Sequence, residues 1–138
     1  VLDAMKFASE EGGPGSADRL VRVLEARSVG FLALATAGAH ACDLLHCASE
    51  AVQTAQGTYH QEEHGILLEV LEHGSRNGEL DIPDVEQTLR TLLHAYAAFA
   101  PPHIFKIDQK RFGSDITAMH SLVLNGLLRR PGAKKRVL

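Results

Sequence analysis

The sequence predicts an all-α protein, a bundle of five to seven helices, and three observations carry this prediction. Apolar residues recur at helical spacing through most of the 138 residues. Stretches of β-branched and aromatic residues with a period of two, which are typical of strands, are absent from the sequence. Gly, Pro and capping residues separate the periodic segments at intervals of helix length. The length fits one domain, which we expect over 1–130, followed by a basic tail over 131–138.

The first 37 residues predict two helices. A short helix begins at Leu2 and is stopped by the Gly-Gly-Pro-Gly run at 12–15. Ser16 can cap the second helix, which continues to about Ala37. The half of this helix that follows Val29 is apolar all round, so we expect it to pass through the centre of the domain.

The middle of the chain predicts a third helix over about 40–55 and a fourth over about 59–76. Asn77 and Gly78 form a typical C-terminal stop for the fourth helix. Asp81 has the capping chemistry that would start the fifth helix.

The last two predicted helices are apolar on more than one side. Pro101-Pro102 ends the fifth helix, 103–112 is a connector, and Ser114 or Asp115 caps a last helix that ends near Arg130. One apolar stripe suffices to pack a helix on its own core. A second stripe indicates a further surface such as a partner subunit, the alternative being a large and well-covered core.

Charge is unevenly distributed along the chain. The net charge is −3, but five of the 14 basic residues follow Leu128, where no acidic residue lies. The preceding body therefore carries nine basic and 17 acidic residues. An acidic body is a poor surface for nucleic acid, because phosphate binding requires clustered Lys and Arg. The tail is expected to be a solvated end, with a weak nucleic-acid contact as the alternative.

The expected compartment is a reducing cytoplasm. Cys42 and Cys47 do not form a disulfide framework, and on a helix they would point away from each other. No apolar run reaches the length of a membrane span, and no signal peptide is recognisable, so we expect no membrane partner. The chain begins with Val1, which suggests processing or a longer parent protein.

Two segments resemble the C-terminal region of TetR-family transcriptional regulators: LLEVLEHGSRNGELDIPDVE at 67–86 and SDITAMHSLVLNGL at 114–127. In that region a helix ends in a turn with Gly-Glu-Leu, and an Asp-initiated helix follows. The closing helix ends in a Leu followed a few residues later by Gly-Leu. The long helix over 17–37, followed by HACDLL at 40–45, looks like the middle of the same domain. The order and lengths of the helices carry most of this resemblance.

The resemblance implies the effector-binding and dimerisation half of a ligand-responsive regulator that acts as a repressor and has no enzymatic activity. The family's N-terminal helix-turn-helix domain, about 50 residues long, is absent from this chain. DNA would be bound only through that domain. Val1 would then lie near the start of the helix that links the two domains.

The same resemblance implies a homodimer in which the last two helices of each subunit form a four-helix bundle. The interface residues expected on these helices are Leu89, Leu92, Tyr96, Phe99, Met119, Leu122, Val123, Gly126 and Leu127. A small and mostly apolar effector would enter a pocket among the middle helices. The pocket residues expected from the sequence are Met5, Phe7, Phe31, Leu34, Cys42, His46, Ser49, His64, Leu68 and His94.

The eight histidines leave an alternative open, a stand-alone metal-binding protein or hydrolase. His60 and His64 fit the spacing H-x-x-E-H of some zinc peptidases, and Cys42 with His46 also share one helix face. Such short patterns arise easily by accident in a His-rich chain. We therefore expect no metal, no cofactor and no enzymatic activity.

Overall fold

A computed structural model describes residues 1–10, 15–37 and 49–128, and this part of the chain is an all-α bundle. Its five α-helices are α1 (Leu2–Glu10), α2 (Ser16–Thr36), α4 (Glu50–Arg76), α5 (Val85–Ala95) and α6 (Gln109–Leu127). Two short 3₁₀ helices, η1 (Tyr96–Phe99) and η2 (His103–Lys106), connect α5 to α6. Within the described residues, the only extended pairing is an isolated bridge between Leu80 and Leu128. The all-α prediction is confirmed.

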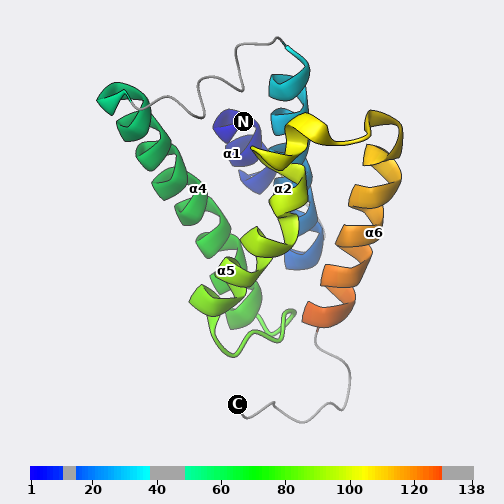
Figure 1. Cartoon of the computed structure of the whole chain (residues 1–138). Coiled ribbons are helices and arrows are strands. Elements are labelled where there is room, and N and C mark those ends of the chain that lie inside the picture. Colours follow the sequence, from blue (N-terminus) through cyan, green and yellow to red (C-terminus); the bar gives the residue numbers. More distant parts are fainter. Residues whose placement is uncertain (11–14, 38–48, 129–138) are drawn as a thin grey trace.

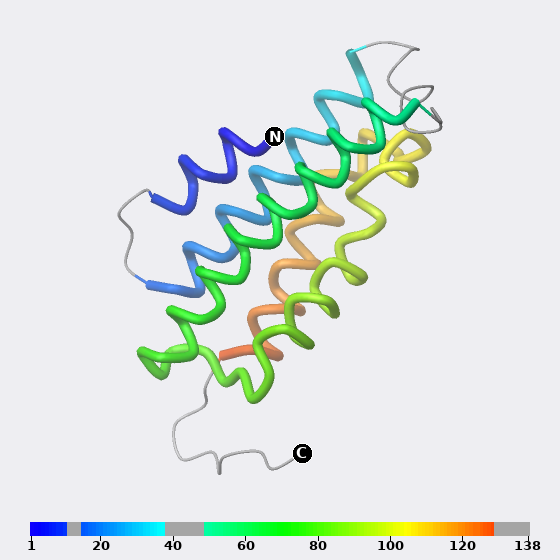
Figure 2. Tube along the Cα trace, turned by 90° about the vertical axis from the view of Figure 1, so that its left-hand side faces the viewer, coloured from blue at the N-terminus to red at the C-terminus, as the bar shows by residue number. Residues whose placement is uncertain are grey.

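Helix α2 is the centre of the arrangement. Figures 1 and 2 show it beside α1, with α4 on one side and α6 on the other. It contacts α1, α4, α6 and both 3₁₀ helices. Its buried stripe includes Leu20, Val23, Leu24 and Phe31. The apolar end of α2 is nevertheless not its most buried part, because Val29 and Leu34 are 48% and 45% exposed, which corrects the expectation from the sequence.

The N-terminus of α2 is capped from a distance. Ser16 was the expected cap, but the helix begins at Ser16 and its side chain makes no capping hydrogen bond. Instead, the Glu79 carboxylate accepts hydrogen bonds from the backbone N–H groups of Ser16 (2.6 Å) and Ala17 (3.1 Å). A carboxylate at this end satisfies free N–H groups and complements the helix dipole. Gly15 leaves room for it, since a Cβ there would lie 2.5 Å from Glu79 Oε1.

Helix α4 is a single helix where the sequence predicts two. It runs without interruption through Gly57, so the predicted break before Tyr59 is wrong. Most of the predicted third helix, 40–48, lies outside the described residues. The predicted stop at Asn77-Gly78 is confirmed: Asn77 is the C-cap, and Gly78 has a φ of 80°, which favours glycine.

The starts of α5 and α6 also differ from the prediction. The carboxylate of Asp84, not that of Asp81, caps α5 by accepting from Gln87 N–H. Helix α6 begins at Gln109 after Asp108, several residues before the predicted cap at Ser114 or Asp115. In both helices the observed N-cap is an Asp, which has the expected capping chemistry, but it lies at a different position from the predicted cap.

The described residues contain no helix that is long and apolar enough to cross a membrane. The buried apolar residues form one continuous core between the helices. Fully buried members include Met5, Leu67, Leu71, Leu80 and Leu89.

Candidate functional site

A cavity of about 540 Å³ opens between α2, α4 and the segment that follows η1. Most of its wall is apolar, and four residues contribute polar groups. The lining residues are Arg27, Phe31, Val52, Ala55, Gln56, Tyr59, His60, Ala100, Pro101 and Pro102. An apolar concavity with a few polar groups is the usual form of a small-molecule site.

A buried ion pair stands at the wall of this cavity. Arg27 on α2 and Glu63 on α4 are 5% and 2% exposed. Arg27 Nε donates to Glu63 Oε2 at 2.7 Å, and Arg27 Nη2 donates to Oε1 at 3.4 Å. Two charges this deeply buried are tolerated because each neutralises the other.

Aromatic rings surround the pair. The Tyr59 hydroxyl donates to Glu63 Oε2 at 2.7 Å, and burial together with this carboxylate raises the pKa of Tyr59. The Arg27 guanidinium lies over the Phe31 ring, 5.0 Å from its centroid. The rings of Phe31 and Tyr59 are 5.8 Å apart. The cavity wall therefore combines aromatic surface with fixed polar groups.

One nitrogen of the guanidinium remains unused. Arg27 Nη1 is buried and has no hydrogen-bond partner among the described residues. Most buried polar groups in folded proteins are paired, so an exception next to a cavity is a candidate contact for a ligand.

Of the predicted pocket residues that the structure describes, one lies at this cavity. Phe31 lines it. Met5 is fully buried in the core and Leu68 packs beside the core, whereas the remaining described members are at least partly exposed. These exposed members are Phe7, Leu34, Ser49, His64 and His94. Cys42 and His46 lie outside the described residues.

Sequence reasoning missed Arg27, Tyr59 and Glu63. A signal for two of them was present, because Arg27 continues the stripe of Leu20 and Leu24, and Glu63 continues that of Leu67. A charged residue on the buried stripe of a helix needs a partner. Opposite charges on the stripes of two helices therefore point to a buried pair.

The histidines of the H-x-x-E-H pattern have separate surroundings. His60 lines the cavity and lies edge-on to Tyr59, whereas His64 Nε2 lies 3.2 Å from Glu86 Oε2 and is not among the lining residues. Glu63, the acid of the pattern, is held by Arg27. Among residues 1–10, 15–37 and 49–128, no group of three His, Cys, Asp or Glu could hold a metal ion.

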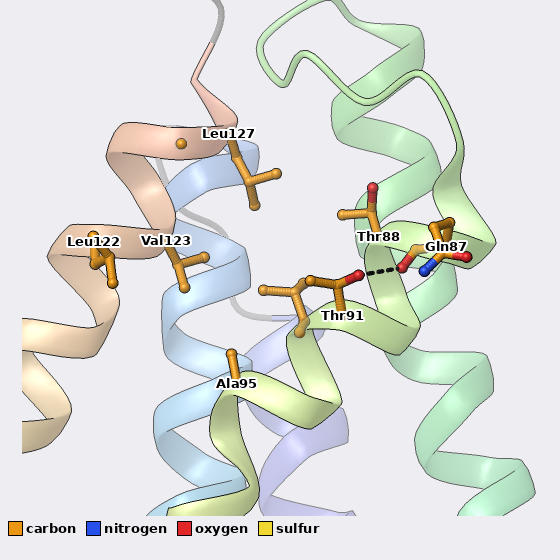
Figure 3. A pocket seen from close by; sticks show the side chains of 9 residues that line it. Gln87, Thr88, Thr91, Ala95, Leu122, Val123 and Leu127 are labelled. Atoms are coloured by element: carbon orange, nitrogen blue, oxygen red, sulfur yellow. Dashed lines mark hydrogen bonds between the residues drawn. The ribbon is translucent and has the colours of Figure 1, made fainter. Parts of the chain in front are cut away.

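A second hollow, of about 320 Å³, lies between α5 and α6 (Figure 3). We call it the α5–α6 groove, and it is lined by Gln87, Thr88, Thr91, Leu92, Ala95, Leu122, Val123, Gly126 and Leu127. Figure 3 shows Thr88 and Thr91 facing Val123 and Leu127 across it. Thr91 Oγ1 donates to the backbone oxygen of Gln87, so its hydroxyl is already used.

The predicted interface residues divide between this groove and the core. Leu92, Leu122, Val123, Gly126 and Leu127 line the groove, and Met119 is half-buried near it on α6. Leu89 and Tyr96 are completely buried and Phe99 is 4% exposed, because α5 and η1 turn these side chains into the chain's own core. These three, and also Leu92 at 4% exposed, have almost no surface left for a second subunit.

Helix η1 connects the two hollows. Ala95, just before it, lines the α5–α6 groove, and Ala100, just after it, lines the cavity. Tyr96 of η1 is hydrogen-bonded to His120 of α6, with 2.6 Å between Tyr96 Oη and His120 Nδ1. Burial raises the pKa of Tyr96 and lowers the pKa of His120.

Comparisons with known proteins give no match. No protein-family model, no curated protein and no solved structure matches the chain. The resemblance to TetR-family regulators therefore stays a prediction, and the geometry of the two hollows is the basis for a function.

Proposed function

We propose that this chain is the effector-binding and dimerisation half of a ligand-responsive transcriptional regulator of the TetR type, acting as a repressor. It binds a small and mostly apolar effector and pairs with a second copy. DNA binding belongs to a separate N-terminal helix-turn-helix domain outside these residues.

The observation that carries this proposal is the cavity between α2 and α4. Its volume of about 540 Å³ lies within the range of small-molecule sites, and apolar side chains form most of its wall. The Arg27–Glu63 pair gives that wall a fixed polar point.

The α5–α6 groove supports the dimer. Leu122 is 71% exposed at its rim, and five aliphatic side chains line it. Two copies related by a twofold axis could cover this surface with α5 and α6 of the partner. The effector then regulates DNA binding by favouring one arrangement of the dimer, by no more than the difference between its affinities for the two arrangements.

The effector part is tested by thermal denaturation in the presence of a panel of apolar small molecules. A molecule that binds only the folded chain raises the melting temperature as its concentration increases. We expect several apolar molecules to do so, and Phe31→Trp, which fills part of the cavity, to reduce the shift. No shift with any member of the panel would contradict effector binding.

The dimer part is tested by size-exclusion chromatography with light scattering. Leu122→Asp places a charge in the groove surface and should convert the dimer to a monomer. Phe7→Asp is the matched control, because Phe7 on α1 is 70% exposed but lies far from the groove in sequence and on another helix. A wild-type chain that is monomeric at high concentration would contradict this part.

A further inference from the structure

We propose that the cavity selects an uncharged ligand with an aromatic or aliphatic body and one hydrogen-bond-accepting oxygen, such as a ketone or ester carbonyl, which accepts from Arg27 Nη1. This inference rests on the proposed effector site and names the chemical class of the effector.

The hydrogen-bond donors in the cavity wall explain why the ligand should carry an acceptor oxygen. Arg27 Nε and Nη2 both donate to Glu63, and the Tyr59 hydroxyl donates to the same carboxylate. Nη1 carries two further N–H groups and has no partner in the described part of the chain. An acceptor oxygen on a ligand would satisfy a buried donor that otherwise stays unpaired.

The charges of the wall favour an uncharged ligand. Glu63 already neutralises Arg27, and both side chains are more than nine-tenths buried. A carboxylate ligand would leave a net negative charge in this buried place, close to Glu63, and would lose its hydration. A carbonyl oxygen accepts the same hydrogen bond without adding a charge.

The remaining wall fits the body of such a molecule. Phe31 and Tyr59 present aromatic rings, and Val52, Ala55 and the segment Ala100–Pro102 provide aliphatic surface. A fused aromatic ring with one short substituent is therefore a suitable probe.

Contact with Nη1 requires a small rearrangement. This nitrogen exposes less than 1 Å² to water, so the guanidinium or a neighbouring side chain must shift before a ligand oxygen reaches it. The cavity beside Arg27 provides room for that shift. In return, the hydrogen bond forms where little water competes for the donor.

The test compares three naphthalenes that differ only in the substituent at one ring position: acetyl, ethyl and carboxylate. Their dissociation constants for the wild-type chain are measured by isothermal titration calorimetry. We expect the acetyl compound to bind about tenfold more tightly than the ethyl compound, as one hydrogen bond to a charged donor would produce. The carboxylate should bind more weakly than the acetyl compound.

A variant pair shows whether Arg27 is the cause. In the double variant Arg27→Met with Glu63→Leu, both members of the buried pair are removed together, so no unpaired charge is left. The ratio of the acetyl and ethyl affinities should fall to about one. The control, Lys6→Met with Glu62→Leu, introduces Met and Leu in the same way at an exposed ion pair of 3.6 Å and should keep the wild-type ratio.

Each failure has a distinct meaning. Equal binding of the acetyl and ethyl compounds would overturn the inference and leave the effector site standing. Tightest binding of the carboxylate would overturn it in favour of an anion site. If none of the three compounds binds, the inference and the effector site are both contradicted, and a tenfold preference that survives in the double variant overturns the role of Arg27.

Discussion

The two hollows of the chain differ in how charge is used. The cavity between α2 and α4 has a buried ion pair in its wall, whereas the described residues that line the α5–α6 groove include no Asp, Glu, Lys or Arg. In the groove, Thr88 and Thr91 of α5 face aliphatic side chains of α6, and Leu122 is largely exposed. The cavity is thus built around directed hydrogen bonds and the groove around shape.

This difference separates two kinds of recognition. A buried charge fixes where a polar atom of a small ligand must lie, because an unpaired donor in a low-dielectric site is costly. An uncharged groove between two helices has no such directed contact and suits another helical surface. Mutations that break the buried pair in the cavity wall should therefore change the free energy of unfolding. Mutations in the groove should change association with a second copy instead.

The largest effect is expected from breaking the buried pair on one side only. Glu63→Leu leaves the Arg27 guanidinium buried without a counter-charge, which should lower the free energy of unfolding by about 3–5 kcal/mol. Urea denaturation measures this change. The double variant Arg27→Met with Glu63→Leu should recover most of the loss. A loss for Glu63→Leu no larger than that for the exposed Glu62→Leu would contradict the importance of the pair.

A smaller effect is expected from Tyr59→Phe. The variant removes one of the three hydrogen bonds to the Glu63 carboxylate and keeps the ring beside Phe31. We expect a loss of about 1 kcal/mol in the free energy of unfolding. An unchanged value would mean that water replaces the hydroxyl at Glu63.

The pair formed by Tyr96 and His120 predicts a dependence on pH. Burial lowers the pKa of His120 below 6.5, while Glu25 acts in the opposite direction. A folded-state pKa below the unfolded one gives stability that is complete above about pH 6.5 and is lost as the pH falls through the folded-state pKa. His120→Asn should therefore reduce the loss of stability between about pH 7 and pH 5. His94→Asn, at an exposed position on α5, is the control and should keep the wild-type slope.

The smallest effect on folding is expected in the groove. Leu122→Ala should change the free energy of unfolding of the monomer by less than about 0.5 kcal/mol, because the side chain is 71% exposed. Measurement at low protein concentration keeps association out of the result. A large loss of monomer stability would show that Leu122 belongs to the core and not to an open surface.

The helical periodicity was sufficient to predict the fold class, α1, α2 and the stop at Asn77-Gly78. It failed at Gly57, because a glycine inside a helix costs only about 1 kcal/mol, which packing along a helix as long as α4 offsets. It failed at Asp81 and Ser114 because several residues near each helix start have capping chemistry, and tertiary packing decides among them.

The candidate site was less predictable than the fold. Phe31 was identified because aromatic residues in apolar helices are obvious pocket candidates. Arg27 and Glu63 were missed because charged residue types are usually exposed, although each continues the buried stripe of its own helix. Only the packing of α2 on α4 brings these two positions, 36 residues apart, into contact.

The four residues of η1 have a consequence for any communication between the two hollows. Ala95 and Ala100 flank this short segment, so η1 is a direct covalent connection between the walls of the two hollows. Such coupling is reciprocal: the factor by which an effector changes the dimerisation constant is the factor by which dimerisation changes the effector's affinity. If the proposed effector and dimer are both correct, the ratio of the effector affinities of the wild-type chain and the monomeric Leu122→Asp chain would measure any such coupling without DNA.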